Sequence, residues 1–370
     1  MASNESVRVW ANGCFDVFHF GHANFLRQAK VMGDYLIAGV HGDLDIAKNK
    51  AHPVMGENER AKIISAVKWV DEVQTGIPYG DVLKTLNEHA CEFCVHGDDI
   101  AQDASGCDIY SECKENGMFR ECKRTEGIST TSIIDRILLG NAGGHALGWN
   151  KTENEMKNEC EPSHVDGEAQ IPKESESNGS SRPFLEMPEE YYQEKINEFS
   201  SKISNPSRKK KMIYTQGVFD LFHSGHVDFL EKCKTSVENG FLVVGILTDE
   251  EVHRVYGSYP VTNTYERALA LLSCKFVGQV KIGVPYEITS QFVDDLKVEY
   301  VCHGRLWELP SDPYKAIREK NIFCQIDSGN DVTTRTIIER IIQSREMYSE
   351  RNAKKPESQF SRVRLQGNKS

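Results

Sequence analysis

Residues 12–26 read NGCFDVFHFGHANFL, and residues 216–230 read QGVFDLFHSGHVDFL, with nine of the fifteen positions identical. Three further pairs of segments follow in the same order at nearly the same separation: HPVMGENER (52–60) with YPVTNTYER (259–267), VHGDD (95–99) with CHGRL (302–306), and STTSIIDRIL (129–138) with TTRTIIERII (333–342). Several matching blocks in a constant order indicate a duplicated domain. The sequence therefore predicts two tandem copies of one fold.

Each copy alternates short apolar runs with longer helical stretches. In the first copy, the runs VRVWA (7–11), YLIAGV (35–40) and FCVHG (93–97) predict strands, and ANFLRQAKVM (23–32) and NERAKIISAV (58–67) predict helices. This alternation is typical of a parallel sheet with crossover helices. We therefore expect the α/β class, with two tandem Rossmann-like domains, each a doubly wound parallel sheet. Ligands of such sheets bind beyond the carboxyl ends of the strands, where this sequence places its His and Gly residues.

The copies are predicted to span residues 5–145 and 206–350. Between them, residues 146–205 are acidic and rich in Ser, Asn, Glu and Gly. Such a composition cannot bury enough apolar surface to offset its ordering entropy. We expect a mostly disordered linker, with a short helix near residues 188–200, and a loose polar tail at 351–370.

Composition excludes several other classes of protein. The net charge of −11 over 370 residues argues against a general nucleic-acid binder, which usually has a basic face. The sequence shows no signal peptide and no stretch of about 18 apolar residues, so we expect a cytoplasmic protein without a transmembrane helix. The eleven cysteines are interpreted as reduced thiols. Cys91 and Cys94 have metal-like spacing but no second pair, so no metal site is predicted.

The segment His19-Phe20-Gly21-His22 lies between the first predicted strand and the helix after it. Two imidazoles at a helix N-terminus can face one anion together with free backbone amides. Gly21 lets a phosphate approach without obstruction by a Cβ. By itself the segment also fits a surface His pair or a metal site, although no third metal ligand is evident.

The segment RTEGISTT (124–131) precedes the helical run SIIDRILL. Ser129, Thr130 and Thr131 predict an N-cap region, whose hydroxyls and amides can hold phosphate oxygens. Arg124 can bind a phosphate through two N–H groups. By itself, an N-cap beside a solvated Arg is the more ordinary interpretation.

Taken together, GCFDVFHFGH, GENER and RTEGISTT resemble the cytidylyltransferase family of H-x-G-H nucleotidyltransferases. The resemblance covers the chain apart from the linker and tail. The tandem arrangement, with RECKRTEGISTT, is similar to the branch that acts on phosphoethanolamine. The branch that acts on phosphocholine has one such domain and a long membrane-sensing amphipathic helix, which this sequence does not show.

The resemblance implies transfer of the cytidylyl group from CTP to phosphoethanolamine, with release of pyrophosphate, in phosphatidylethanolamine synthesis. It implies Mg²⁺ with the CTP, CTP and phosphoethanolamine as the partners, a homodimer as one possible assembly, and a place in the cytoplasm or at the surface of the endoplasmic reticulum. The first copy is the expected catalytic domain. Phosphocholine and glycerol phosphate are the alternative substrates.

The resemblance also implies residue roles. His19, His22, Lys50 and Arg124 are the expected catalytic residues, and Asp16 is expected to order the His-bearing turn. The expected CTP-binding residues are Gly13, Cys14, Phe15, Gly21, Arg60, His96, Gly97, Asp98, Arg124, Gly127, Ile128, Ser129 and Thr130. The expected site for the phosphorylated amino alcohol contains Asn12, Lys50, Tyr79 and Tyr110. Asn12 departs from the family, which usually has Asp there, and this departure weakens the choice of phosphoethanolamine.

The second copy keeps His223 and His226 but loses charge around them. Lys50 aligns with Gly257, Arg124 aligns with Ser328, and Gly127 aligns with Asp331. A site that lacks two cations and gains a carboxylate is poorly suited to phosphoryl transfer. We therefore predict a degenerate second site, for which a nucleotide-sensing or scaffold role is the alternative from another class.

Overall fold

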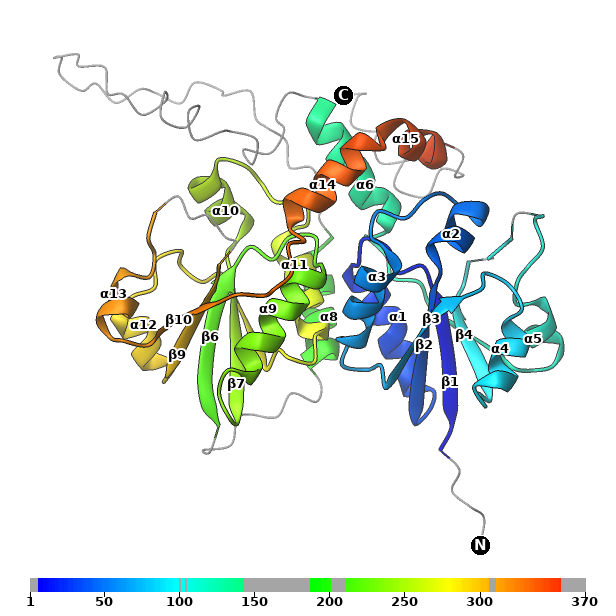
Figure 1. Ribbon diagram of the computed structural model, residues 1–370, viewed down its shortest axis with the longest axis horizontal. Helices are drawn as coiled ribbons and strands as arrows, with labels where there is room; N and C mark the ends of the chain where they lie inside the picture. Colours follow the sequence, from blue (N-terminus) through cyan, green and yellow to red (C-terminus); the bar gives the residue numbers. More distant parts are fainter. Residues whose placement is uncertain are drawn as a thin grey trace, which may run out of the picture.

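The computed structural model describes residues 6–99, 101–103, 105–142, 187–200, 210–305 and 311–353. Within these ranges it contains two parallel five-stranded sheets, one in each copy (Figure 1). The predicted α/β class and the duplication are thereby confirmed. Most of the predicted linker and tail lies outside the described residues.

The first copy has one sheet covered by helices on both faces. Its elements are β1 (Arg8–Gly13), α1 (Phe20–Val31), β2 (Tyr35–His41), α2 (Asp43–Asn49), α3 (Glu57–Ser65), β3 (Glu72–Ile77), α4 (Val82–Glu88), β4 (Phe93–Gly97), α5 (Ser111–Glu115), β5 (Phe119–Cys122) and α6 (Thr130–Ala142). The strand order is β3-β2-β1-β4-β5. The strand order therefore reverses between β1 and β4, which is where such sheets bind ligands.

The second copy repeats this arrangement. Its elements are β6 (Lys211–Gly217), α9 (Ser224–Thr235), β7 (Gly240–Ile246), α10 (Asp249–Tyr256), α11 (Thr264–Ser273), β8 (Gln279–Ile282), α12 (Ser290–Asp295), β9 (Tyr300–Gly304), α13 (Lys315–Glu319), β10 (Phe323–Ile326) and α14 (Thr334–Gln343). The strand order β10-β9-β6-β7-β8 matches the first sheet strand for strand. The two sheets therefore have the same topology.

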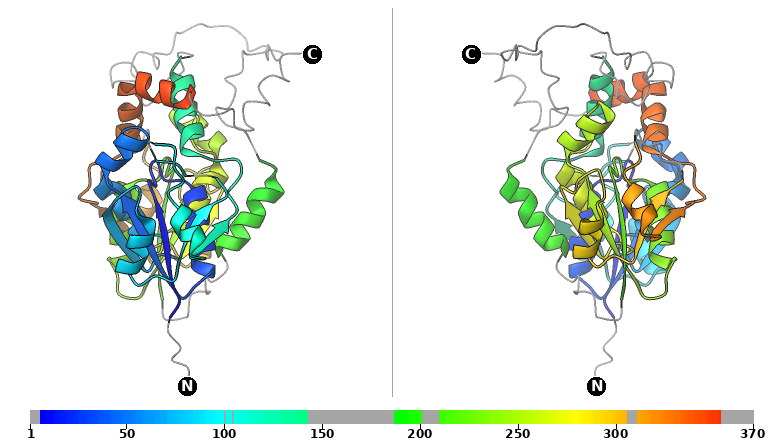
Figure 2. Two further views of the ribbon diagram at one scale, coloured as in Figure 1. Left: turned by 90° about the vertical axis from the view of Figure 1, so that its right-hand side faces the viewer. Right: turned by 90° about the vertical axis from the view of Figure 1, so that its left-hand side faces the viewer.

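Two further helices lie outside the repeat. Helix α8 (Glu189–Ser200) occupies the range in which the sequence predicted a short helix. Helix α15 (Arg345–Ala353) continues past the predicted domain end at residue 350. Figure 2 shows α8 along one side of the molecule, with α6, α14 and α15 together at the end where the strands terminate.

The two copies face each other around an approximate two-fold axis. The rings of Phe18 and Phe222, which are equivalent in the repeat, lie 6.1 Å apart between centroids. Nearby, the amide of Lys68 donates to the Ser273 carbonyl at 2.9 Å, and the equivalent amide of Lys275 donates to the Ala66 carbonyl at 2.8 Å. Contacts that are reciprocal in this way define an isologous interface, of the kind formed between identical subunits.

Two equivalent ion pairs cross this interface. Arg136 binds Glu266 through two bonds of 2.7 and 3.0 Å. Arg340 binds Glu59 through two bonds of the same lengths. The first pair is buried, with side-chain exposures of 6% and 2%, whereas the second is partly exposed, at 36% and 19%. The same ion pair thus occurs in two different environments.

Helix α8 connects the copies on one side of the axis. The ring of Tyr192 stacks on Tyr265 of α11 at 5.0 Å between centroids. Glu198 forms an ion pair of 2.7 Å with Arg27 of α1, and Phe199 packs edge-on against Trp69. Because α8 contacts helices of both copies, it adds to the interface that holds them together.

Candidate active site

The turn after β1 is strained and firmly anchored. Phe15 and Val17 have φ values of 52° and 45°, in the left-handed region that non-glycine residues seldom adopt. The carboxylate of Asp16 accepts the amides of Val54 and Met55 at 2.8 and 2.9 Å. Burial raises the pKa of Asp16, although these two amides act to lower it. As predicted, Asp16 orders the His-bearing turn, and it does so by attaching the loop before α3.

His19 and His22 lie at the start of α1 with their rings stacked, 3.9 Å apart between centroids. The amide of Gly21 donates to Nδ1 of His19 at 3.1 Å, so the neutral His19 ring carries its proton on Nε2. A Cβ at Gly21 would lie 2.8 Å from the His19 ring, so glycine is required here. The sequence prediction that the pair lies at a helix N-terminus is confirmed.

Both imidazoles are neutral at pH 7. Burial lowers the pKa of His19 well below its usual value, and the repulsion that a charged His19 would experience from a protonated His22, from Arg124 and from Arg136 lowers it further. Burial, with the charges of Arg124 and Lys50, lowers the pKa of His22 to about 3. The pair is therefore ready to donate hydrogen bonds to an anion, and an arriving phosphate would favour protonation.

Lys50 brings positive charge to this turn from the end of α2. Its Nζ lies 3.9 Å from Sγ of Cys14 and 5.3 Å from the centroid of the Tyr79 ring. The residue is exposed to solvent, although protein atoms crowd around the ammonium group. Burial lowers the pKa of Lys50, but the Cys14 thiol and Tyr79 phenol outweigh this effect and raise it. Lys50 is thus fully charged at pH 7.

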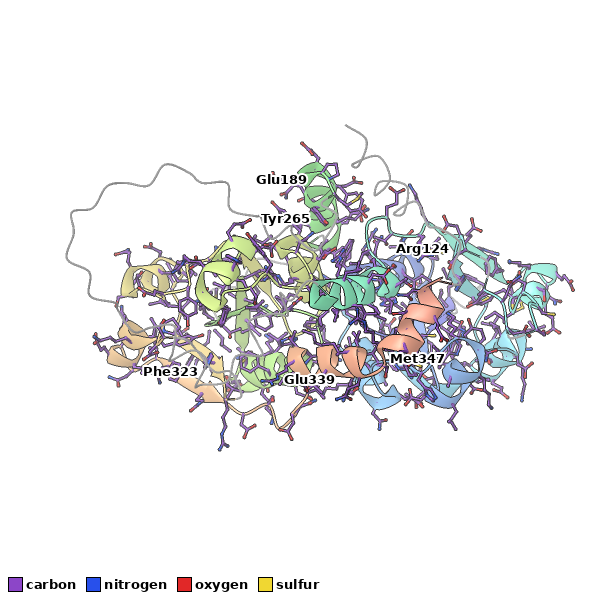
Figure 3. The ribbon with its side chains drawn as sticks, turned by 90° about the horizontal axis from the view of Figure 1, so that it is seen from above. Arg124, Glu189, Tyr265, Phe323, Glu339 and Met347 are labelled. Atoms are coloured by element: carbon purple, nitrogen blue, oxygen red, sulfur yellow. The ribbon has the colours of Figure 1, made fainter. Side chains whose placement is uncertain are left out.

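Arg124 follows β5, in the loop that leads to α6. Its backbone amide donates to Asp98 at 3.3 Å, and its guanidinium contacts the Asp99 carboxylate at 3.4 Å. Both members of the Arg124–Asp99 pair are more than half exposed, so the pair contributes little energy. Arg124 is therefore free to exchange Asp99 for a phosphate. Figure 3 shows Arg124 over the first copy, on the same face as α15.

The end of β4 carries His96. Nδ1 of His96 lies 3.2 Å from the carbonyl of Gly97, and its ring packs 4.7 Å from Tyr110 and 6.4 Å from Phe25. Burial lowers the pKa of His96. The segment from His96 to Asp98, which was expected to bind CTP, therefore follows β4 beside β1, at the switch point of the sheet.

The loop before α6 has mixed roles. Ser129 caps the helix, because its Oγ accepts the Ser132 amide at 3.0 Å. The Thr130 hydroxyl donates to the Asp16 carbonyl at 2.9 Å, which attaches the loop to the His-bearing turn. Gly127 has a φ of 83°, and Ile128 lies against Gly21. The loop thus borders the His pair, while its hydroxyls already have protein partners.

Behind the turn, Asn12 belongs to a buried and uncharged network. The Tyr110 hydroxyl donates to Oδ1 of Asn12 at 3.1 Å, and Nδ2 of Asn12 lies 3.2 Å from Nε2 of His41. Nδ1 of His41 lies 3.1 Å from the Ile77 carbonyl, so Nδ1 is the protonated nitrogen. Burial lowers the pKa of His41 to about 4. Sequence reasoning missed His41, which the second copy replaces with Leu247.

Arg60 occupies a different position from the one expected of a phosphate ligand. It is fully buried, and it donates to Met55, Cys14 and His41 carbonyls and to the Asp43 carboxylate. Arg267 of the second copy forms the equivalent set of bonds. Since the second copy has lost the counterparts of Lys50 and Arg124, a network kept in both copies indicates a structural role.

The second copy keeps its His pair in a closed setting. His223 and His226 stack at 3.7 Å between centroids, and burial lowers the pKa of His226 to about 3. A Cβ at Gly225 would lie 2.3 Å from the Val332 carbonyl oxygen, which therefore lies against the start of α9. Asn330 donates to Ser224 and Asp228 at 3.3 and 2.7 Å. A backbone carbonyl oxygen thus lies against Gly225, whereas the side chain of Ile128 lies against the equivalent Gly21.

The parallel sheets and the His-bearing turn at the switch point define the class of doubly wound nucleotide-binding α/β proteins. A family model described as cytidylyltransferase-like matches residues 10–136 and 214–341. The ethanolamine-phosphate cytidylyltransferase of Mus musculus is 42% identical over 94% of this chain and 89% of its own. That of Dictyostelium discoideum is 39% identical over 95% of both chains. The chain belongs to the cytidylyltransferase-like family and, within it, to the ethanolamine-phosphate cytidylyltransferases.

Two partial matches complete the comparison. Choline-phosphate cytidylyltransferase A of Rattus norvegicus is 44% identical over 134 residues, which are 36% of each chain. A solved structure, the lipopolysaccharide core biosynthesis protein from Thermoplasma volcanium GSS1, is 30% identical and covers 32% of this chain and 97% of its own, with a TM-score of 0.28. The first likeness extends over about one copy, whereas the ethanolamine-phosphate enzymes match both copies.

Proposed function

We propose that this chain transfers the cytidylyl group of CTP to phosphoethanolamine, giving CDP-ethanolamine and pyrophosphate. The observation that carries the proposal is the stacked pair His19 and His22 at the N-terminus of α1, with Lys50 and Arg124 facing it. The choice of substrate is supported by relatives that match nearly the whole chain and are named for ethanolamine phosphate. The first copy is the catalytic one.

The reaction requires positioning and charge stabilisation rather than a covalent intermediate. A phosphate oxygen of phosphoethanolamine attacks the α-phosphorus of CTP, and the bond from that phosphorus to the oxygen of the β-phosphate breaks, so that pyrophosphate leaves. The Nε2–H of His19 and the His22 ring would donate to α-phosphate oxygens, where negative charge accumulates. Lys50 and Arg124 would balance that charge from opposite sides, and holding both reactants together lowers the entropic barrier.

The proposal includes Mg²⁺ as the companion of CTP. When bound, the ion would neutralise charge on the departing pyrophosphate. No group of three or more His, Cys, Asp and Glu suited to hold a metal gathers among the residues that the structure describes. We therefore assign the ion no protein ligands and expect it to arrive with the nucleotide.

We place the enzyme in the cytoplasm, where it has access to CTP, or at the surface of the endoplasmic reticulum. In the described part of the chain, no helix has both the length and the apolar character that a membrane crossing requires. We also propose that the head group lies near Asn12, Lys50, Tyr79 and Tyr110. The Asn12 network is neutral, so an ammonium group there would be held by oxygen acceptors rather than by a carboxylate at position 12.

The test is pyrophosphate release by the purified full chain with CTP and Mg²⁺. Phosphoethanolamine, phosphocholine and glycerol 3-phosphate are compared at equal concentrations. We expect phosphoethanolamine to give the highest kcat/KM by a wide margin. Turnover of phosphocholine at an equal or greater rate would contradict the substrate assignment.

Two double variants assign the reaction to one copy. We expect His19→Ala with His22→Ala to abolish turnover, since loss of one such donor costs about 10²–10³-fold in kcat. His223→Ala with His226→Ala should leave most of the wild-type turnover. Activity that survives in the first double variant and disappears in the second would place the reaction in the C-terminal copy.

A further inference from the structure

The C-terminal helix α15 belongs to the second half of the chain but packs onto the first copy. Figure 3 shows α15, labelled at Met347, over the first copy beside α6. The buried ring of Tyr348 directs its hydroxyl to the His52 carbonyl, to which it donates at 3.1 Å. Nδ2 of Asn352 donates to the Asp135 carboxylate of α6 at 2.8 Å. The helix is therefore held at two points of the first copy.

One of these points is the loop that carries Lys50. His52 is two residues beyond Lys50, and Val54 and Met55 are attached to Asp16. Arg340, just before α15, donates to the Val54 carbonyl at 3.3 Å. The loop is thus held by hydrogen bonds to the His-bearing turn on one side and to Arg340 and Tyr348 on the other.

Arg351 reaches this region with an unused hydrogen-bond donor. Its guanidinium carbon lies 4.9 Å from the centroid of the Tyr348 ring, and its Nε donates to Oδ1 of Asn352 at 3.2 Å. Its second terminal nitrogen, Nη2, is buried and has no hydrogen-bond partner among the described residues. An unpaired buried guanidinium nitrogen is costly, and an anionic oxygen would satisfy it.

The surroundings of Arg351 point to the phosphate side of the site. Burial lowers its pKa, whereas the charges of Asp16, Tyr348, Asp135 and Cys14 act to raise it. Asp16 and Cys14 belong to the turn that carries His19, and Cys14 is also the neighbour of Lys50. Tyr348 and Asn352, on either side of Arg351 in α15, attach this helix to the loop after Lys50 and to α6, and both of these elements contact the His-bearing turn.

We propose that Arg351 binds the β- or γ-phosphate of the nucleoside triphosphate, so that a residue from the end of the second copy completes the active site of the first. This inference rests on the proposed function, because it assigns the triphosphate to the His19 site. The guanidinium is positioned in advance by Tyr348 and Asn352. It would hold the pyrophosphate part of CTP before the reaction and balance its charge as it leaves.

The test is binding of CTP, CMP and inorganic pyrophosphate to the full chain by titration calorimetry in the presence of Mg²⁺. A charged hydrogen bond contributes about 1.5–3 kcal/mol, so Arg351→Gln should weaken binding of CTP and pyrophosphate about 10- to 100-fold. CMP, which lacks the β- and γ-phosphates, should bind within about twofold of the wild type. Arg345→Gln, an exposed residue of the same helix, is the matched control and should change none of the three.

Two further variants separate binding from folding. Arg351→Lys keeps the charge and loses the forked donors, so its CTP affinity should lie between those of the wild type and Arg351→Gln. Tyr348→Phe keeps the ring under Arg351 and removes the hydrogen bond to the His52 carbonyl. We therefore expect it to lower kcat by a larger factor than it lowers the affinity for CTP. The inference would be overturned if Arg351→Gln weakened the binding of CMP and CTP equally, or if it weakened the binding of neither. A wild type that binds CTP but does not turn over phosphoethanolamine would contradict the proposed substrate and leave the Arg351 result intact.

Discussion

The two ion pairs across the pseudo-two-fold interface permit a paired test of how burial changes the energy of one interaction. Arg136→Met leaves the Glu266 carboxylate buried at 2% exposure, where it still accepts a hydrogen bond from the Asn263 amide at 2.9 Å. Removal of one member of a buried ion pair costs about 3–5 kcal/mol. Arg340→Met removes the same bonds from Glu59, but water reaches that carboxylate, so we expect a loss of about 1 kcal/mol or less.

The assay is urea unfolding of the full chain, followed by tryptophan fluorescence and circular dichroism. Arg136→Met should lower the free energy of unfolding by about 2–5 kcal/mol more than Arg340→Met, from the difference between those two losses. Arg136→Met with Glu266→Gln leaves no buried charge and should recover most of the loss. Arg335→Gln, which breaks an exposed pair within α14, is the control and should change stability by less than about 0.5 kcal/mol.

Two results would refute this reasoning. Equal and small losses from Arg136→Met and Arg340→Met would show that burial of Glu266 does not decide the energy. A double variant no more stable than Arg136→Met would show that the buried charge is not the source of the loss.

Two further predictions concern pH and Arg60. The pKa of His226 is about 3 in the folded chain and about 6.5 when unfolded, so its contribution to stability is complete above pH 6.5 and is lost as the pH falls toward 3. Each pH unit below about 6.5 should remove up to about 1.4 kcal/mol from the free energy of unfolding. Urea unfolding at pH 7.5 and at pH 5.5 should therefore show a smaller loss of stability between the two pH values for His226→Gln than for the wild type. The same loss in both proteins would contradict this prediction. Arg60→Lys and Arg267→Lys should each lower the free energy of unfolding by about 2–4 kcal/mol, because both lose equivalent buried bonds. If Arg60 is instead a phosphate ligand, Arg60→Lys will keep its stability and lose CTP affinity in calorimetry.

The fold was predictable because its signals are periodic and occur twice. The apolar runs ending near Gly13 and Gly97 are short enough for strands, and the same blocks recur in the second half. The His pair and Asp16 were predictable for a related reason, since a compact motif between a strand and a helix has few structural interpretations.

The rest of the site depends on contacts between distant segments. Nothing near Arg60 in the sequence shows that its side chain points inward, but Arg267 was an available signal, because it persists in a copy that has lost Lys50 and Arg124. His41 has no counterpart in the second copy, so the repeat gave no reason to single it out. The segment from Arg351 onward was predicted to be loose because it is polar. Its few apolar residues do not reveal that the first copy supplies their packing partners.

The reciprocal contacts around Phe18 and Phe222 have a consequence for how the protein behaves on dilution. Two separate subunits that met through such a surface would dissociate as their concentration fell, by mass action. Here one polypeptide carries both faces, so each is always present at the high effective concentration that a covalent connection sets. The interface should therefore persist at nanomolar protein, and a substitution at one face is not duplicated at the other. Each half can consequently change its sequence independently, as the replacement of Lys50 and Arg124 by Gly257 and Ser328 in the second copy illustrates.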